Sequence, residues 1–236
     1  MNAIPDPYTD PEFASGALVI IDTQRDVLDG GPFEIAGTSA ALVRMRELLD
    51  AFRAAKRPVV HVVRLYLPDG GNADLSRRRM LEDGAQLVLP GSPGSQIADD
   101  LLPGTDGLLD SRLLLDSQLL LAGGVQELGP REVAIYKPRW GAFYETPLEG
   151  YLRGQGISTL VFCGCNFPNC PRTSIYEASE RDFRVVLARD AVSGLYERGE
   201  RELERIGVRP LDSAEVVVAL GDRRAPPTLA TPSPAS

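Results

Sequence analysis

Short apolar runs without polar alternation recur along the chain, and each has the length of a β-strand. They are rich in Val, Ile and Leu and comprise Ala17–Asp22, Pro58–Arg64, Val133–Lys137, Thr159–Gly164, Arg184–Asp190 and Glu215–Ala219. Continuous apolar runs of this kind are typical of parallel strands covered on both faces. The pattern therefore predicts a sheet of about six mainly parallel strands.

Helical periodicity separates most of these runs. Between the first two, the apolar positions at helical spacing are Leu42, Met45, Leu48, Leu49, Phe52 and Ala55. Thr38 or Ser39 could cap the start of this helix. After the third run, Thr146-Pro147-Leu148-Glu149 has the form of a capping box with proline in the first helical position. Strands that alternate with helices predict an α/β fold: a three-layer, doubly wound sheet with helices on both faces.

The domain organisation follows from composition along the chain. A length of 236 residues suits one sizeable core, which we expect to span residues 16–224 after an N-terminal arm, residues 1–15. Residues 68–130 are rich in Gly, Pro and Leu with weak periodicity, so we expect short helices and loops covering one end of the sheet. Residues 225–236 lack core-forming side chains, which predicts a disordered tail.

Charge and cysteine content narrow the function classes. The net charge is −8 and no Lys/Arg run stands out, which argues against a nucleic-acid partner. No apolar run has transmembrane length, and residues 1–13 do not resemble a secretory signal, so we expect a cytoplasmic protein without a membrane partner. The three cysteines are confined to residues 163–170, which is not the distribution of a disulfide framework.

Candidate chemistry lies where the predicted strands end. In doubly wound sheets, ligands bind beyond the carboxyl ends of the strands. The residues at these ends are Asp22, Arg64, Lys137, Asp190 and the segment 164–170. An acid, a base and a thiol could therefore converge on one pocket.

Cys170 is the candidate nucleophile. Pro171 follows it, and proline favours the first helical position, so Cys170 is predicted at the N-cap of a helix. The helix dipole and free backbone N–H groups at such a position favour a thiolate and could hold an oxyanion. The alternative, a buried structural cysteine, stays open on position alone.

The other cysteines and the histidine have different predicted roles. Cys163 lies within an apolar run and is expected in the core, whereas Cys165 lies in the following turn and is a candidate to line the pocket. The cysteine spacing lacks the pairing typical of zinc sites, so no metal is expected. His61 lies inside the second run, which favours a packed histidine over a catalytic one. The base would then be a carboxylate, for which Asp22 is the candidate, with a turn-capping role as its alternative.

Three motifs, taken in chain order, are similar to those of a known family. They are Asp22-Thr23-Gln24 after an apolar run; Lys137 followed by Ala142-Phe143 and Thr146-Pro147-Leu148; and Gly164, Cys170 and Ala178 followed by Asp190-Ala191. Together they resemble the isochorismatase-like cysteine hydrolases, the superfamily of nicotinamidase and N-carbamoylsarcosine amidohydrolase. The resemblance spans residues 16 to 220.

The resemblance implies an Asp22–Lys137–Cys170 triad that needs no cofactor. In that family the aspartate takes the thiol proton, the thiolate attacks a carbonyl, and a thioester is then hydrolysed. The oxyanion is held near a cis peptide, which by position would be Cys165–Asn166. The family also implies a small-molecule substrate and a homodimer or homotetramer.

Departures from the family pattern narrow the range of expected substrates. The metal-binding nicotinamidases carry an Asp-x-His motif and a second histidine, whereas this chain has only His61, which disfavours their metal site and nicotinamide itself. Isochorismatases proper lack the cysteine, so Cys170 favours acyl chemistry. No Gly-x-Gly-x-x-Gly turn follows the first run, which argues against a nucleotide-binding Rossmann protein.

Several side chains are candidates for substrate binding. They are Gln24, Arg64, Trp140, Phe143, Phe167 and Asn169, with Arg139, Tyr144 and Asn166 beside them. Aromatic rings suit a planar or apolar substrate portion, arginine suits a carboxylate, and amides suit hydrogen bonds, but core packing and turn formation explain the same residues. The predicted function is hydrolysis of a C–N bond in a small amide or carbamoyl-type substrate. The alternatives are hydrolysis of a larger natural-product amide or lactam, as in streptothricin hydrolase-like members, and a non-catalytic binding role.

Overall fold

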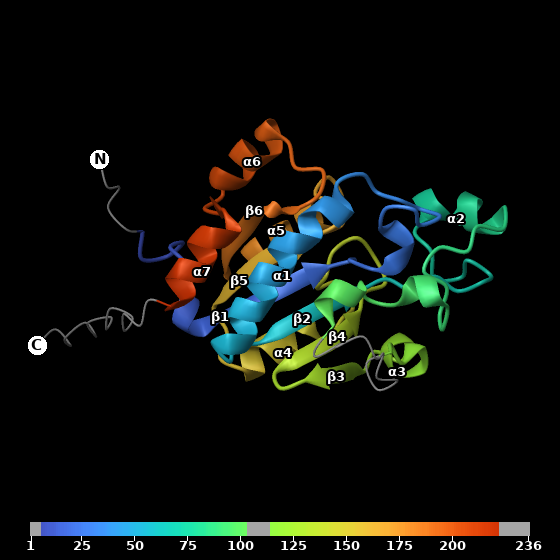
Figure 1. Cartoon of the computed structure of the whole chain (residues 1–236), viewed down its shortest axis with the longest axis horizontal. Helices are drawn as coiled ribbons and strands as arrows, with labels where there is room; N and C mark the ends of the chain where they lie inside the picture. The colour runs from blue at the N-terminus through green and yellow to red at the C-terminus, as the bar shows by residue number, and fades with distance from the viewer. Residues whose placement is uncertain (1–5, 103–113, 222–236) are drawn as a thin grey trace, which may run out of the picture.

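The computed structural model describes residues 6–102 and 114–221, so the predicted tail lies outside the described residues. Within them, one sheet of seven strands has the order β3-β4-β2-β1-β5-β6-β7 (Figure 1). The strands are β1 Gly16–Ile21, β2 Val59–Val63, β3 Val125–Gly129, β4 Glu132–Tyr136, β5 Thr159–Gly164, β6 Arg184–Val192 and β7 Arg209–Leu211. All neighbouring pairs are parallel except β3 with β4. The predicted α/β fold is confirmed.

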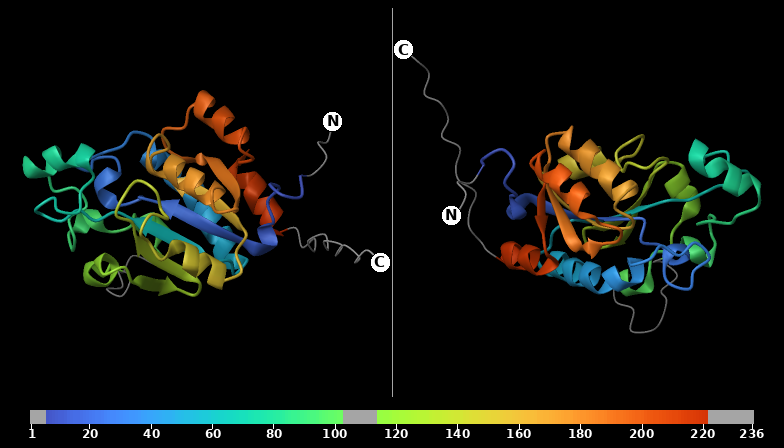
Figure 2. Two further views of the ribbon diagram at one scale, coloured as in Figure 1. Left: turned by 180° about the vertical axis from the view of Figure 1, so that it is seen from behind. Right: turned by 90° about the horizontal axis from the view of Figure 1, so that it is seen from above.

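Helices cover both faces of the sheet, as predicted (Figure 2). On one face lie α1 Thr38–Ala54 and α7 Ser213–Gly221; on the other lie α4 Leu148–Gly154, α5 Cys170–Ser179 and α6 Glu197–Glu204. The remaining α-helices are α2 Leu75–Glu82 and α3 Ser117–Leu121. Short 3₁₀ turns occupy Phe13–Ser15, Arg25–Val27, Pro93–Ser95 and Asp99–Leu101. No described helix combines the length and the apolar character that crossing a bilayer requires.

The central strand shows why the apolar runs are continuous. Leu18 and Ile20 of β1 pack into the cluster beneath α1, whereas Val19 and Ile21 pack into the cluster beneath α4 and α5. Every residue of β1 is buried. Since a fully buried aliphatic side chain contributes roughly 1.5–3 kcal/mol, both faces of the strand must be apolar for the three layers to hold together.

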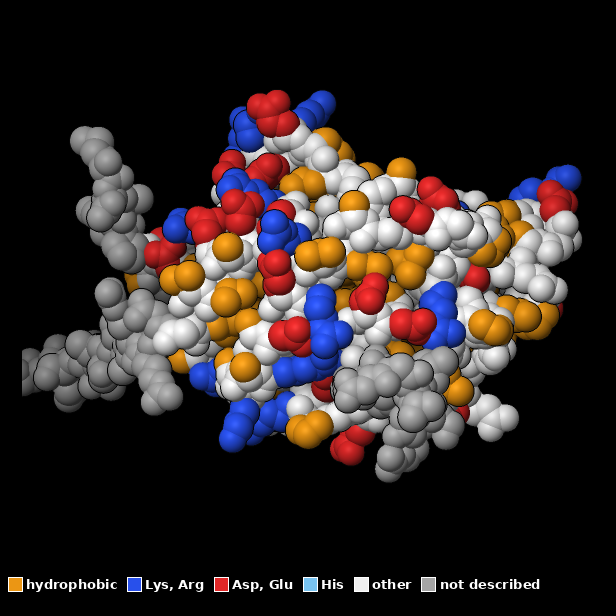
Figure 3. All heavy atoms as spheres, viewed as in Figure 1, with side chains coloured by type: hydrophobic (Ala, Val, Ile, Leu, Met, Phe, Trp, Pro, Cys, Tyr) orange, Lys and Arg blue, Asp and Glu red, His pale blue; other side chains and the backbone are white. Residues whose placement is uncertain are grey.

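One predicted strand is wrong. Residues 215–219 lie in α7, where Val216 is buried while Val217 and Val218 are exposed. Figure 3 shows hydrophobic side chains at the surface over α1 and α7, where Val43 is also exposed. A short apolar run cannot be assigned to a strand or a helix by periodicity alone, and here it belongs to a helix.

Two strands were not predicted. β3 is an antiparallel edge strand in which buried and exposed positions are mixed, and β7 has three residues and contains Pro210. Neither has the continuous apolar character of the central strands, because edge strands are covered less completely. The weakly periodic region predicted to cover one end of the sheet does contain α2, α3 and two 3₁₀ turns. Figure 1 places α2 beyond the end toward which β1 points.

The predicted helix starts are near the observed ones but differ in detail. Gly37, with φ of +84°, precedes α1, and Thr38 is already helical with its hydroxyl bonded to Ser193. At α4, the Thr146 hydroxyl accepts a hydrogen bond from the Leu148 backbone N–H at 3.3 Å, but the helix begins one residue after the proline. In neither helix does the N-cap residue itself make the side-chain capping bond that the sequence pattern predicted.

Candidate active site

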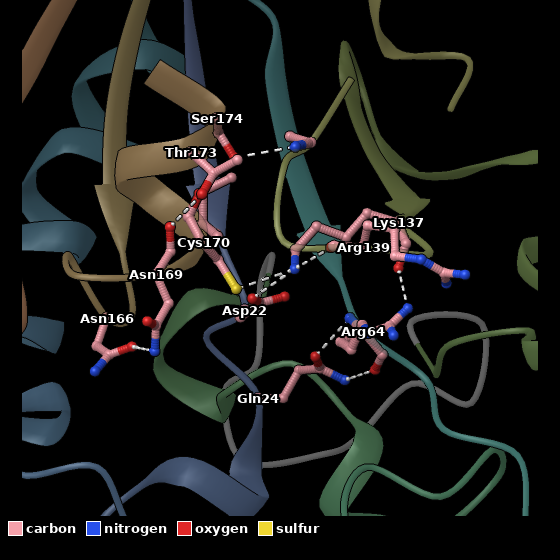
Figure 4. A network of polar contacts seen from close by, with 12 residues as sticks. Asp22, Gln24, Arg64, Lys137, Arg139, Asn166, Asn169, Cys170, Thr173 and Ser174 are labelled. Atoms are coloured by element: carbon pink, nitrogen blue, oxygen red, sulfur yellow. Dashed lines mark hydrogen bonds and ion pairs between the residues drawn. The ribbon is translucent and has the colours of Figure 1, made fainter. Parts of the chain in front are cut away.

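The three triad candidates come from separate elements and meet at the carboxyl edge of the sheet (Figure 4). Asp22 directly follows β1, Lys137 directly follows β4, and Cys170 is the first residue of α5, which follows β5. Cys170 was predicted at the N-cap, a position that Asn169 occupies. Because β2 lies between β1 and β4, Lys137 reaches the others by the length of its side chain.

The Lys137 ammonium contacts both of the other triad candidates. Its Nζ lies 2.9 Å from Asp22 Oδ2 and 3.2 Å from Cys170 Sγ, and it donates to the carbonyl of Arg139 at 3.1 Å. The ammonium has three donors, so each one has a partner. Lys137 is only 1% exposed, which leaves these contacts unscreened by water.

The pKa of Lys137 follows from this environment. Burial by itself would lower the pKa of the ammonium, but the negative charges of Asp22 and Cys170 and the hydrogen bond with Asp22 outweigh burial and raise the pKa above its ordinary value. The charged form of Lys137 is therefore favoured. A permanent cation next to a carboxylate and a sulfur stabilises negative charge on either group.

The pKa of Cys170 moves in the direction opposite to the prediction. Burial raises it first and the charge of Asp22 raises it further, while Lys137 lowers it without cancelling them. Cys170 therefore rests as a thiol. The helix start favours a thiolate, but the desolvation of a side chain that is 7% exposed is the larger effect.

Asp22 is placed to accept the thiol proton. Its Oδ2 pairs with Lys137, whereas its Oδ1 is buried and accepts no hydrogen bond from any described residue. The residue has φ of +49°, an uncommon backbone conformation that aspartate tolerates better than most side chains. The carboxylate thus has one oxygen held and one open for acid–base work.

The turn between β5 and α5 supplies backbone donors beside the sulfur. The Cys165–Asn166 peptide is cis, at the position that the family resemblance indicated. Within the described part of the chain, neither the N–H of Asn166 nor that of Cys170 donates to another protein group. Free N–H groups at a helix start are suited to an oxyanion.

A cavity of about 530 Å³ opens over the triad. Asp22, Lys137 and Cys170 line its polar part, while its apolar part is lined by Val27, Phe33, Ile35, Leu87 and Val88. The volume lies within the range of small-molecule sites, which are mostly apolar with a few placed polar groups. The described residues include no group of three or more His, Cys, Asp or Glu side chains that could share a metal ion.

Four of the six predicted substrate-binding residues line this cavity: Gln24, Arg64, Trp140 and Asn169. Two of these use their polar groups within the protein. The Gln24 amide bonds both the N–H and the carbonyl of Arg64 at 2.9 Å, and it also donates to Ser95. The Arg64 guanidinium donates to the Lys137 carbonyl at 2.8 Å and pairs with Asp74 at 3.0 Å. Both side chains therefore fix the strand ends that carry the triad.

The two predicted phenylalanines do not reach the cavity. Phe167 is 0% exposed and packs edge-to-face on Tyr196, with ring centroids 5.4 Å apart. Phe143 is buried beside Phe183. Both belong to the core cluster under α4 and α5. The structure therefore places both rings in the core and not in the cavity lining, because core packing uses the same aromatic side chains.

His61 and the other cysteines lie as the sequence indicated. His61 is buried in β2, and its Nε2 lies 2.8 Å from Glu132 Oε1, away from the cavity lining. Cys163 is buried within β5. Cys165 lines the cavity, but burial and then the charge of Asp22 raise its pKa to about 12, so its thiol stays protonated.

Sequence reasoning missed the cavity wall contributed by residues between the strands. Phe33, Glu34, Tyr66 and Arg77 all line the cavity, yet none lies at a strand end. Of these four, only Arg77 lies in the weakly periodic region, residues 68–130, which was itself a signal because loops without their own core are often functional. Which loop side chains face the site depends on long-range packing.

Curated relatives and solved structures share this architecture. The chain is 26% identical to a ureidoacrylate amidohydrolase of Methylobacterium radiotolerans over 233 residues, which cover 90% of this chain and 79% of the relative. It is 29% identical to a ureidoacrylate amidohydrolase of Rhizobium rhizogenes over 208 residues, which cover 83% and 76%.

Two crystal structures extend the comparison to the fold. An isochorismatase family protein from Desulfovibrio vulgaris superposes with a TM-score of 0.72 at 28% identity, over 88% of this chain and 99% of that one. N-carbamoylsarcosine amidase from Thermoplasma acidophilum gives 0.65 at 22% identity, over 84% and 96%. The isochorismatase domain model matches residues 16–110 and 121–210. Since this match extends over most of the chain, the protein belongs to the isochorismatase family.

Proposed function

We propose that this protein is a cysteine hydrolase that cleaves a C–N bond in a small amide or carbamoyl-type substrate through a thioester. One observation carries the proposal: a single buried ammonium, Lys137 Nζ, contacts both Asp22 Oδ2 and Cys170 Sγ at the floor of a cavity. A nucleophile, an acid–base group and a fixed cation within reach of each other are the elements of covalent acyl transfer.

The first step couples proton transfer to attack. Because burial keeps Cys170 protonated at rest, Asp22 takes the proton as Sγ bonds to the carbonyl carbon. The open oxygen of Asp22 is the acceptor. As Asp22 becomes neutral, the negative charge moves to the intermediate. Lys137 pairs with this charge as it paired with the carboxylate before, so no charge is left unpaired in the cavity.

The later steps return the proton and release the product. The free N–H groups of Asn166 and Cys170 are the donors for the oxyanion of the tetrahedral intermediate. Its C–N bond breaks, and the amine or ammonia leaves with the proton that Asp22 had taken. Water then attacks the thioester, giving up a proton to Asp22, which passes it back to the departing sulfur.

The relatives support this reaction class. Proteins named for the hydrolysis of ureidoacrylate match most of the chain, and N-carbamoylsarcosine amidase shares the fold. Both names describe hydrolysis of a C–N bond. The cavity is larger than a minimal amide requires, so bulkier amides and lactams belong in the substrate panel.

The test combines turnover with mass detection of the intermediate. Wild-type protein, Cys170→Ala and a control, Cys163→Ala, are assayed for ammonia or amine release across primary amides, ureides and lactams. We expect turnover and a covalent adduct in the wild type and in Cys163→Ala, whose lost thiol lies in the core, and neither in Cys170→Ala. Retained activity in Cys170→Ala contradicts the mechanism. Absence of any adduct or turnover from the wild type favours a non-catalytic role.

A further inference from the structure

One cation in the cavity has no role in the chemistry described so far. Arg77, on α2, lines the cavity and is partly buried, and its guanidinium carbon lies 5.5 Å from the ring centroid of Trp140. Within residues 6–102 and 114–221, no carboxylate lies within 4.0 Å of its guanidinium. A guanidinium that stacks on an aromatic ring keeps its donors free at the edge of its plane.

Three nearby arginines are paired with carboxylates. Arg64 pairs with Asp74, Arg25 with Asp99 and Arg79 with Asp83. The Arg64 guanidinium also donates hydrogen bonds to backbone carbonyls. Arg77 differs from Arg64, the other arginine of the cavity lining, because it has no acidic partner within the described chain.

The other charges at the cavity form two ion pairs, with one carboxylate left over. Asp22 balances Lys137, and Asp74 balances Arg64. Glu34 lines the cavity as well, but it is exposed and accepts a hydrogen bond from the Gly30 N–H at 2.9 Å. The protein as a whole is acidic, so a partly buried cation that has no carboxylate partner among the described residues is not a consequence of overall composition.

Much of the remaining lining of the cavity is apolar. Phe33, Ile35, Leu87 and Val88 contribute to it together with Arg77 and the triad. A ligand that fills about 530 Å³ while reaching the sulfur must place an apolar segment against these side chains. The cavity thus combines the triad, an apolar lining and a cationic side chain.

We propose that the substrate is an anion whose carboxylate pairs with Arg77 while its amide or ureido group meets Cys170. This rests on the proposed amidohydrolase function and adds the substrate class: a carboxylic acid that carries the scissile group across an apolar spacer. Arg77 is the specificity-determining residue, and Trp140 holds its guanidinium plane. A charged hydrogen bond in such a setting corresponds to a preference of roughly 10- to 100-fold for the acid over an uncharged analogue.

The test uses matched ureides. Wild-type protein, Arg77→Gln and Arg78→Gln are assayed for ammonia release from 4-ureidobutanoate and 4-ureidobenzoate and from their methyl esters. Cleavage gives the amine and carbamate, which decomposes to ammonia and carbon dioxide. Arg78 is exposed on the same helix and does not line the cavity, so its variant removes equal charge elsewhere.

We expect the wild type to cleave one or both acids roughly 10- to 100-fold better than the esters in kcat/KM. Arg77→Gln should lose that preference through KM and treat the esters as the wild type does, whereas Arg78→Gln should keep the preference. Equal cleavage of acid and ester by the wild type overturns the inference and leaves the amidohydrolase function standing. An equal loss in Arg78→Gln overturns it too.

A binding measurement separates the inference from the chemistry. If no ureide is cleaved, calorimetry reports recognition alone. Cys170→Ala and the double variant Cys170→Ala/Arg77→Gln are each titrated with 4-ureidobenzoate and with its methyl ester. Binding of the acid at least about tenfold more tightly than the ester, lost with Arg77→Gln, supports anion recognition and places the failure in the proposed reaction. Equal binding of both compounds, or no binding of either, overturns the inference.

Discussion

Replacement of Lys137 by methionine tests the central ion pair most directly. The substitution keeps the volume of the buried stem but removes an ammonium with three partners, two of them at 2.9 Å and 3.2 Å. Asp22 is then left facing the cavity floor without its cation. Removal of one member of a buried pair typically destabilises a protein by about 3–5 kcal/mol, and we expect the free energy of unfolding to fall by that amount.

The effect on catalysis should be larger than the effect on stability. Without Lys137, the remaining influences on Cys170 are burial and the charge and hydrogen bonding of Asp22, all of which raise the pKa of the thiol. We expect kcat/KM to fall by roughly a thousand-fold or more, which corresponds to about 4 kcal/mol of transition-state stabilisation. Alkylation of Cys170 by iodoacetamide between pH 7 and 9 should slow in parallel.

The controls separate charge from packing. Lys56→Met removes an equal charge from an exposed position and should change neither urea unfolding nor turnover. Asp22→Asn combined with Lys137→Met removes both charges, so it should recover part of the lost stability but none of the activity. The reasoning is refuted if the free energy of unfolding of Lys137→Met lies within 1 kcal/mol of the wild-type value and its kcat/KM lies within tenfold of the wild-type value.

Two further predictions concern residues outside the triad. Burial would raise the pKa of Glu132, but hydrogen bonds with His61 and Arg53 lower it from 4.5 to about 2. The ionised side chain therefore contributes roughly 3 kcal/mol to the free energy of unfolding above pH 4.5, and this contribution is lost as the pH falls toward 2. Urea unfolding of Glu132→Gln should therefore show a weaker pH dependence than the wild type in that window, and an equal dependence contradicts the assignment. Phe167→Ala should lower the free energy of unfolding by about 3–5 kcal/mol, as expected for a core ring. A stable variant with a raised KM would instead restore Phe167 to the substrate site.

The convergence of the three triad candidates was predictable because strand ends and short motifs determine their positions locally. Asp22 and Lys137 each end an apolar run, and Cys170 precedes a proline that opens a helix. In a parallel sheet, residues at the carboxyl ends of the strands converge on one edge, independently of the fold of the connecting segments. Five of the six predicted strands overlap observed ones for the same reason: their apolar runs are continuous.

The substrate side of the site was only partly predictable. Phe143 and Phe167 lie within the motifs that contain Lys137 and Cys170, yet both rings point into the core. Arg77 lies in a helix without a marked apolar face, far from any motif, yet it lines the cavity. Sequence proximity to a catalytic residue fixes where the backbone goes, but the direction of a side chain depends on which neighbouring surface it can fill.

The protonation state of Cys170 shows a second limit of local reasoning. The sequence reveals a helix start, which lowers the pKa of a thiol, but not the cavity floor, whose desolvation raises it more. The result suits the proposed reaction, because a thiol beside the Asp22–Lys137 pair carries no net charge into a mostly apolar cavity. Negative charge then appears on sulfur only as Asp22 accepts the proton, when a substrate carbonyl is present to receive the electron pair. Under the proposal made above, the Arg77 guanidinium, which has no carboxylate partner within the described residues, then selects which carbonyl arrives.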